Sequence, residues 1–406
     1  MEDFNTTVLV FAVLLVLGAL LSGVAHRSFL SLTAIFVIAG FVLGDGALEV
    51  IHFDAGGAFV SDLEIVALVV ILFRDGLEVE REMLQQAWHL PLRKLVLGMP
   101  ITCVLIAVAA YTLTSLSWAQ SFLLGALLSP TDPVLSSAVV TNPRVPRVIR
   151  HSLNLESGLN DGLALPAVLA FAAVVADTPG FSWWQFVLQD VGLGFAFGVA
   201  VGFIAARLLP RGRGLEEEVG LHVKSLYALG VAFAAYGIAV LPPEGNGLIA
   251  AFVAAITLGI LRNDIRTAFQ NRADDIVELV KLSVFVVFGS LLTFDGLFGD
   301  GWAAVAIVAF TLLVARPVAV AVALAGTDTD APTRAFMAWF GPKGVATMTF
   351  SLLVLGEALP GGQRIFNIAA LAVFVSIIAH GLTDTPGAEW IARVTERRRA
   401  RQPLRV

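Results

Sequence analysis

Long apolar runs, each about 20 residues in length, recur along this chain and are separated by short polar stretches. A run of this length is what an α-helix needs to cross the hydrocarbon core of a bilayer. Hydrophobic side chains make up 57% of the 406 residues and charged ones only 14%, too few to cover a soluble globule of that size. The runs are continuous rather than alternating, which indicates helices and not the strands of a β-barrel. The sequence therefore predicts an all-α polytopic membrane protein without a large soluble domain.

The apolar windows, bounded by charges or by Gly and Pro breaks, predict about thirteen transmembrane helices. They lie near residues 7–24, 28–45, 60–78, 95–116, 118–140, 150–176, 185–208, 220–241, 245–261, 276–297, 302–325, 333–357 and 365–383. The acidic segment Met1-Glu2-Asp3 precedes the first run, where a signal peptide would carry positive charge, so we interpret that run as a span. We expect residues 1–384 to form the membrane domain and residues 385–406 to form a short basic cytoplasmic tail.

Basic residues fall on one side of this arrangement, and short cytoplasmic loops are where Lys and Arg are enriched. The residues on that side are Arg27, Arg81, Arg93, Lys94, Arg144, Arg147, Arg150, Arg207, Arg211, Arg213, Arg262, Arg266, Arg272, Arg334 and the tail residues Arg393, Arg397, Arg398, Arg399, Arg401 and Arg405. The loops of the other side hold essentially only Arg364. This asymmetry predicts an external N-terminus and a cytoplasmic C-terminus, with the tail on the anionic inner leaflet as a topology anchor.

Two predicted spans are interrupted by helix breakers, Ser129–Pro133 in the fifth span and Gly341–Gly344 in the twelfth. Proline removes a backbone donor and clashes with the preceding turn, so each span should unwind at membrane depth. Because the breaks are seven spans apart, the two broken helices cross the membrane in opposite senses, as in an inverted repeat. We expect six-helix repeats over about residues 7–176 and 220–383, joined by a connector helix at about 185–208. This symmetry favours a transporter over a channel or a membrane enzyme.

Ionisable residues at membrane depth are costly unless they are paired or hydrated, which makes each of them a functional candidate. The central ones are Asp132, Glu156, Asp161, Arg316 and Lys343. In the sixth span, Glu156, Ser157, Asn160 and Asp161 fall within about 140° of the helix circumference and form one polar face. Such oxygen ligands, with one or two negative charges, suit a small monovalent cation. Asp161 has no cationic neighbour in sequence, which favours a functional role for it.

The other charges have structural alternatives. Glu156 should form a buried ion pair, and Arg316 is its natural partner. Asp132 and Lys343 lie beside the helix breaks, where they either offset the partial charges of half-helix ends or ligate an ion directly. Asp75, at the inner end of the third span, is either a boundary charge or an accessory site.

These motifs resemble those of the monovalent cation:proton antiporter superfamily, specifically the sodium/proton exchangers of the bacterial and archaeal NhaP type that are related to eukaryotic NHE exchangers. The matching segments are Ser129–Pro133, Glu156–Asp161, Arg316–Pro317 and Phe340–Gly344. The resemblance covers nearly the whole chain. It implies a thirteen-helix fold in which the fifth and twelfth helices cross as unwound pairs, and it implies a homodimer.

The resemblance also implies residue roles. Asp161 would be the exchanged site, and Ser157 and the backbone near Thr131 would help to hold the cation, Na⁺ in this family. The Glu156–Arg316 ion pair would steady the core. The family commonly has arginine where this chain has a lysine after Gly341-Pro342.

We therefore expect a sodium/proton antiporter of the plasma membrane, the inner membrane of a prokaryote, in which Asp161 binds either H⁺ or Na⁺ (or Li⁺) by alternating access. Because Asn160 cannot titrate, exchange should be one for one and electroneutral. Lys343 could change this stoichiometry, since a buried lysine can lose its proton whereas arginine does not. Potassium/proton exchange on the same scaffold is the nearest alternative, and a gated cation channel is a more distant one.

Other function classes find little support in the sequence. One cysteine, Cys103, excludes a disulfide scaffold and CxxC metal sites, and the six histidines include no HExxH motif. No catalytic Ser-His or paired-carboxylate motif stands at matching depth, so we do not expect an enzyme. We expect the transported Na⁺ and H⁺ in place of a cofactor, the lipid bilayer as the surroundings, and no nucleic acid as a partner.

Overall fold

The computed structural model describes residues 32–79, 88–132, 142–210 and 220–401, together with residues 9, 12–16, 20 and 139. This part of the chain is helical and contains no strand, so the predicted all-α class is confirmed. The helices are α2 Leu32–Leu43, α3 Ala58–Glu78, α5 His89–Arg93, α6 Met99–Leu113, α7 Trp118–Leu128, α9 Arg147–Val175, α10 Trp183–Gln185, α11 Gly194–Leu208, α12 Leu221–Ala239, α13 Gly247–Leu261, α14 Asn263–Arg272, α15 Asp274–Ser290, α16 Phe294–Phe298, α17 Trp302–Phe310, α18 Arg316–Ala323, α19 Ala331–Trp339, α20 Val345–Gly356 and α21 Gly362–Arg401. Among the described residues, three π-helical turns continue these helices, η1 Lys94–Gly98, η3 Phe186–Leu193 and η4 Thr311–Ala315.

Within the described ranges, six helices are long and apolar enough to cross a membrane, and there are seven if α13 and α14, bent by 116°, form one span. Shorter apolar helices, α2, α7 and α20, accompany them. The count of thirteen spans stays a prediction. The first predicted span, residues 7–24, lies mostly outside the described residues, as do Pro133 and several of the basic residues used to orient the chain: Arg27, Arg81, Arg211, Arg213 and Arg405.

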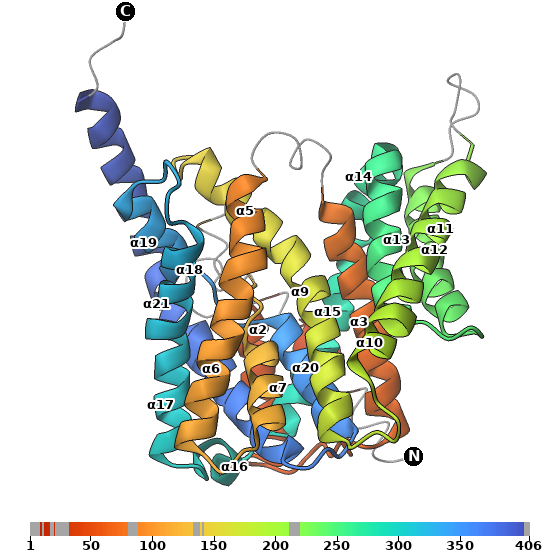
Figure 1. The fold of residues 1–406 in the computed structure, drawn as a ribbon, viewed down its shortest axis with the longest axis horizontal. Helices are drawn as coiled ribbons and strands as arrows, with labels where there is room; N and C mark the ends of the chain where they lie inside the picture. Colours follow the sequence, from red (N-terminus) through yellow and green to blue (C-terminus); the bar gives the residue numbers. More distant parts are fainter. Residues whose placement is uncertain are drawn as a thin grey trace, which may run out of the picture.

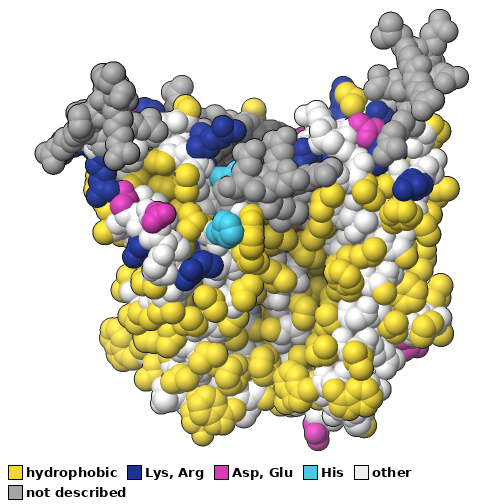
Figure 2. Space-filling view, turned by 45° about the horizontal axis from the view of Figure 1, so that its top comes forward, with side chains coloured by type: hydrophobic (Ala, Val, Ile, Leu, Met, Phe, Trp, Pro, Cys, Tyr) yellow, Lys and Arg dark blue, Asp and Glu magenta, His cyan; other side chains and the backbone are white. Residues whose placement is uncertain are grey.

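The outer surface has the character of a membrane protein. Figure 2 shows hydrophobic side chains covering the sides of the molecule below a rim where Lys and Arg side chains gather. Large apolar side chains are exposed to an extent that would be costly in water, up to 86% for Trp302. In Figure 1, α5, α14 and α19 lie at one end of the molecule and α16 lies at the other. Arg93 of α5, Arg266 and Arg272 of α14 and Arg334 of α19 belong to the first of these ends (Figure 1).

The two helix breaks lie directly against each other in the interior. α7 ends at Leu128, just before Ser129-Pro130, and the twelfth predicted span divides into α19 and α20 around residues 340–344. The backbone N–H of Asp132 donates to the carbonyl oxygen of Pro342 across the crossing, at 2.8 Å. A Cβ at Gly344 would clash with the carboxylate of Asp132, so only glycine allows this approach. The crossing places unwound backbone from both halves of the chain at one point.

Helix α21 extends well beyond the predicted span at residues 365–383. It runs through residue 384, where we placed the end of the membrane domain, and ends at Arg401 although Pro386 lies inside it. Ala388 and Ile391 from this extension pack with Phe336 of α19 in a second apolar cluster. Arg398 pairs with Asp330 at the start of α19. The extension is therefore helical and packed against α19, the first half of the twelfth predicted span.

Replacing Asp330 by alanine should lower the melting temperature, because its side chain caps α19 by accepting a hydrogen bond from Thr333 N at 2.8 Å. Such a cap contributes about 1 kcal/mol. Burial acts to raise the pKa of Asp330, yet hydrogen bonds from Thr333 and the charges of Arg398 and Arg334 hold this pKa below its ordinary value. The stabilisation is thus present above about pH 4 and is lost as pH falls through the lowered pKa. Thermal unfolding at about pH 7 and pH 3 checks this, with Asp328→Ala as the control that should change nothing.

Candidate functional site

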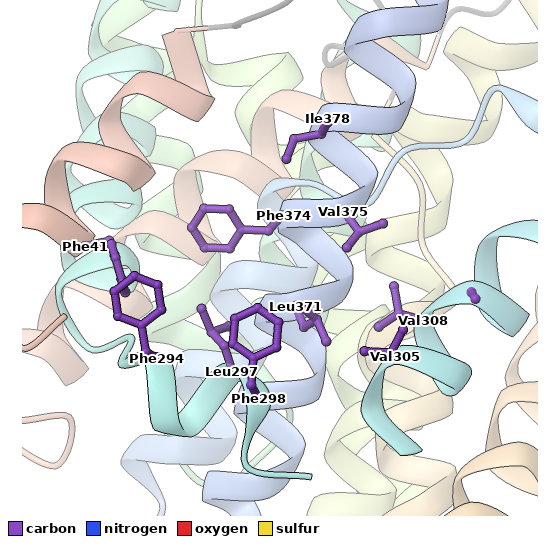
Figure 3. Close-up of a pocket in the computed structure, with 11 residues that line it drawn as sticks. Phe41, Phe294, Leu297, Phe298, Val305, Val308, Leu371, Phe374, Val375 and Ile378 are labelled. Atoms are coloured by element: carbon purple, nitrogen blue, oxygen red, sulfur yellow. The ribbon is translucent and has the colours of Figure 1, made fainter. Parts of the chain in front are cut away.

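An apolar cavity of about 510 Å³ opens between α2, α16, α17 and α21. Figure 3 shows its lining, which includes Phe41, Phe298, Val305 and Phe374. None of its lining residues carries a polar or charged side chain, so it offers no side-chain ligand to a cation. The candidate site therefore lies elsewhere, at the crossing of the broken helices.

At this crossing, charged side chains meet the ends of the half-helices. Lys343 Nζ donates to the carbonyl oxygen of Pro130, just beyond α7, at 3.0 Å. The N–H of Val345, the first residue of α20, donates to Asp132 Oδ2 at 3.3 Å. Each side chain thus opposes the partial charge at the end of the other broken helix. The backbone N–H of Lys343 also donates to Ser376 Oγ on α21 at 2.7 Å, which anchors the crossing to the last helix.

Helix α9 brings Asn160 and Asp161 to the crossing. Asn160 Nδ2 donates to the carbonyl oxygen of Thr131 at 2.7 Å and to Thr131 Oγ1 at 3.1 Å, so α9 is tied to the first break. Asp161 is only 6% exposed. Its Oδ1 and the Oδ1 of Asn160 accept no hydrogen bond from any described residue. A buried acceptor without a donor is costly, so these two oxygens are where an ion, a proton or water would be favourable.

Two further carboxylates lie close to Asp161. Asp75 and Asp132 are within electrostatic range of it. Asp75 is buried on α3, and a Cβ at Gly158 of α9 would lie 3.2 Å from its carbonyl oxygen, so the two helices pack closely there. Ser157, next to Gly158, is half-buried. The structure therefore brings the predicted residues Thr131, Asp132 and Asp75 to the part of α9 that carries its polar face.

Glu156 lies at the centre of a buried ionic network. Its Oε1 is 3.1 Å from Arg316 Nη1, and its Oε2 is 2.5 Å from Lys94 Nζ. Arg316 also donates to the carbonyl oxygens of Phe340 and Met337, at 3.2 and 3.4 Å, at the end of α19. The network therefore links α9 to the second helix break as well as to the helix that follows α5.

Both cations of this network adjoin π-helical turns. Lys94 is the first residue of η1, and Arg316 directly follows η4. Such turns are rare and shift the facing of the side chains beyond them. The two turns occur in the fourth and eleventh predicted spans, which correspond to each other in the predicted inverted repeats. Lys94 and Arg316 thus each bring one cation to the same carboxylate, from corresponding predicted spans.

The sequence of this chain is similar to those of known membrane exchangers. A family model described as "Sodium/hydrogen exchanger, transmembrane" matches residues 12–390. The chain belongs to this exchanger family. The K(+)/H(+) antiporter NhaP of Alkalimonas amylolytica is 26% identical over 400 residues, which cover 96% of this chain and 68% of that protein. The Na(+)/H(+) antiporter NhaG of Bacillus atrophaeus is 25% identical over 370 residues, 86% of this chain and 68% of that protein.

The fold is shared with a solved structure as well. The sodium proton antiporter MjNhaP1 from Methanocaldococcus jannaschii superposes with a TM-score of 0.82 at 17% identity, over 97% of this chain and 99% of that chain. The predicted antiporter fold is therefore confirmed. Family membership makes the chain a monovalent cation/proton antiporter, a transporter of a multi-pass membrane family.

Two of the buried lysines that are linked to the site residues, Lys94 and Lys281, were not predicted from the sequence. The prediction that Lys94 is a basic loop residue is wrong, because Lys94 is only 2% exposed and pairs with Glu156. The continuous helix begins at His89, ahead of the predicted span at residues 95–116, and so carries Lys94 inside. Lys281, which is 6% exposed on α15, lies inside the apolar run 276–297. A charge within such a run was the available signal.

Proposed function

We propose that this antiporter exchanges Na⁺ (or Li⁺) for H⁺ one for one by alternating access, with Asp161 as the shared site of the two ions. The observation that carries the proposal is the buried Oδ1 of Asp161, which has no hydrogen-bond donor among the described residues and lies where the two broken helices cross. A carboxylate in this position is stabilised by either a proton or a cation, and the two compete for it. Competition for one carboxylate couples the two fluxes.

The surrounding oxygens form the proposed cation shell. Thr131 supplies its hydroxyl and carbonyl oxygens, and Asn160 holds both in place through its amide. Ser157 lies one turn before Asp161 on α9 and adds a hydroxyl, while Asp132 and Asp75 add negative potential. Hard oxygen ligands of this kind suit Na⁺, Li⁺ or K⁺, which we regard as substrates; we propose no resident cofactor.

Potassium/proton exchange is the second candidate, because several relatives, including the NhaP2 protein of Shewanella sp. strain ANA-3 at 27% identity, are named K(+)/H(+) antiporters. Both candidates use the same site and the same competition. They differ in the size of the shell that Thr131, Ser157 and Asp161 form around the ion.

We also propose a setting for the transporter. The basic end of the molecule would face the cytoplasm, with the N-terminus outside, in the plasma membrane of a prokaryote. The homodimer that the sequence resemblance implies would be its assembly. One-for-one exchange there would serve pH homeostasis.

A proteoliposome assay tests the proposal, with ΔpH dissipation recorded on addition of Na⁺, Li⁺ or K⁺ and with the membrane potential clamped by potassium and valinomycin. We expect Na⁺ and Li⁺ to dissipate ΔpH. Loaded Asp161 has the same charge with H⁺ as with Na⁺, so a potential of about 100 mV should leave rate and end point unchanged, although it is worth about 2.3 kcal/mol per charge moved. Dissipation by K⁺ alone would select the second candidate.

Lys343 provides the sharpest test of the stoichiometry. If its proton left during the cycle, a sodium gradient would drive a current in the wild type. Solid-supported-membrane recordings on wild type and Lys343→Arg separate the cases, because arginine keeps its proton. A current that is present in the wild type and absent from Lys343→Arg contradicts electroneutral exchange.

A further inference from the structure

Lys281 is a buried lysine that has no role in the proposed exchange of cation and proton at Asp161. It lies in the middle of α15 and is 6% exposed. Its ammonium makes no hydrogen bond and no ion pair with any residue that the structure describes. An ammonium at membrane depth is costly to keep charged without compensation, so negative charge in its surroundings must offset it.

The helices around α15 show where that negative charge is. α15 packs mainly against α2, α3 and α20. Neither α2 nor α20 contains a charged residue, as their sequences LTAIFVIAGFVL and VATMTFSLLVLG show. On α3, Arg74 lies 2.8 Å from Glu78 and 3.3 Å from Asp75, so one arginine is shared between two carboxylates. Lys281 is within electrostatic range of both Asp75 and Asp161.

Asp161 and Lys281 carry opposite charges in the membrane interior. Asp161 Oδ1 is a buried acceptor without a donor among the described residues. Lys281 is 6% exposed and forms no ion pair with a described carboxylate. The transported cation must bind beside the same carboxylate. A fixed ammonium in electrostatic range therefore repels it and offsets the same negative charge that attracts it.

We propose that Lys281 is a tethered competitor of the transported cation: its ammonium offsets the negative charge of Asp75 and Asp161 in the empty site and weakens cation binding. This inference rests on the proposed role of Asp161. The empty carrier thereby avoids an uncompensated buried carboxylate, and a bound ion is released more readily. Removing the ammonium should tighten cation binding, which is the opposite of what damage to the fold would do.

The test measures the apparent KM for Na⁺ and for K⁺ in proteoliposomes, at alkaline pH where protons compete least. Lys281→Gln and Lys281→Met both remove the charge, and methionine keeps the unbranched chain. We expect the KM of the cation that is transported to fall about tenfold in both variants, from loss of one repelling charge in a partly screened interior. Lys281→Arg retains the charge and should keep the wild-type KM.

Lys224→Gln is the matched control, because Lys224 is 5% exposed but pairs with Asp264 on α14, outside the crossing. Its KM should equal that of the wild type. An unchanged or raised KM in both folded variants of Lys281, or an equal fall in Lys224→Gln, overturns the inference. Asp161→Asn is run in parallel. Exchange that persists in Asp161→Asn refutes the proposed function itself, whereas an inactive Asp161→Asn with unaltered Lys281 variants refutes only the role of Lys281.

Discussion

Replacing Asp161 by asparagine should abolish cation/proton exchange and leave the protein folded. The substitution removes the titratable oxygen at nearly constant volume. It places an amide where the carboxylate oxygen has no donor partner, so the interior keeps its packing and loses one buried negative charge. A site without this charge can bind neither a proton nor a cation, so both fluxes should disappear together. The expected loss is complete within the sensitivity of the ΔpH assay.

Several measurements make this result interpretable. The elution volume in size-exclusion chromatography and the melting temperature show whether the variant is folded. Asp190→Asn, an aspartate of η3 outside the crossing, is a matched control that removes a carboxylate from another helix and should exchange at the wild-type rate. Near-normal sodium uptake driven by ΔpH in Asp161→Asn would refute the mechanism. Uptake lost equally in both variants would show that the assay reports insertion or folding and not the site.

The site residues that could be predicted from the sequence are those that depart from a strong local pattern, either an apolar span or a continuous helix. Asp161 and Glu156 are charges in an apolar run, and the Pro-containing breaks cannot continue a helix. A charge in an apolar run or a proline in a helix can be recognised from the sequence without knowing which residue it contacts. The pairing of Glu156 with Arg316 was also predictable, since a buried carboxylate needs a cation and few were available at that depth.

Residues whose role depends on exact helix ends or on packing were not predictable. Lys94 directly precedes Leu95, so it fits the end of a loop as well as the start of a buried turn, and only the early start of its helix at His89 decides between them. The π-turns that bring Lys94 and Arg316 to one carboxylate leave no mark in hydropathy. The extension of α21 past residue 384 was not predictable, because its charges resemble those of a solvated tail. Only the structure shows that Ala388 and Ile391 pack in a cluster with Phe336 of α19.

Replacing Glu156 by glutamine should cause the largest loss of stability among substitutions in the core. One carboxylate serves two buried cations, Lys94 at 2.5 Å and Arg316 at 3.1 Å. Without its charge, two like charges remain buried beside each other, and breaking even one buried pair typically costs about 3–5 kcal/mol. Lys94→Met should cost much less, because the Glu156–Arg316 pair that remains is neutral, whereas the intact network carries one excess positive charge.

This asymmetry can be measured by thermal unfolding in detergent of the single variants Glu156→Gln, Arg316→Gln and Lys94→Met and of the double variants that include Glu156→Gln. The effects of substitutions within one ionic network on the free energy of unfolding are not additive. Each double variant should therefore lose less stability than the sum of the losses of its two single variants. Adding Lys94→Met to Glu156→Gln should even recover stability, since it removes one of the two uncompensated cations. If the stability losses of Glu156→Gln and Arg316→Gln are additive in the double variant, the two side chains are not paired. If Lys94→Met destabilises as much as Glu156→Gln, the carboxylate is held mainly by lysine, and Arg316 acts instead through its hydrogen bonds to Phe340 and Met337 at the end of α19.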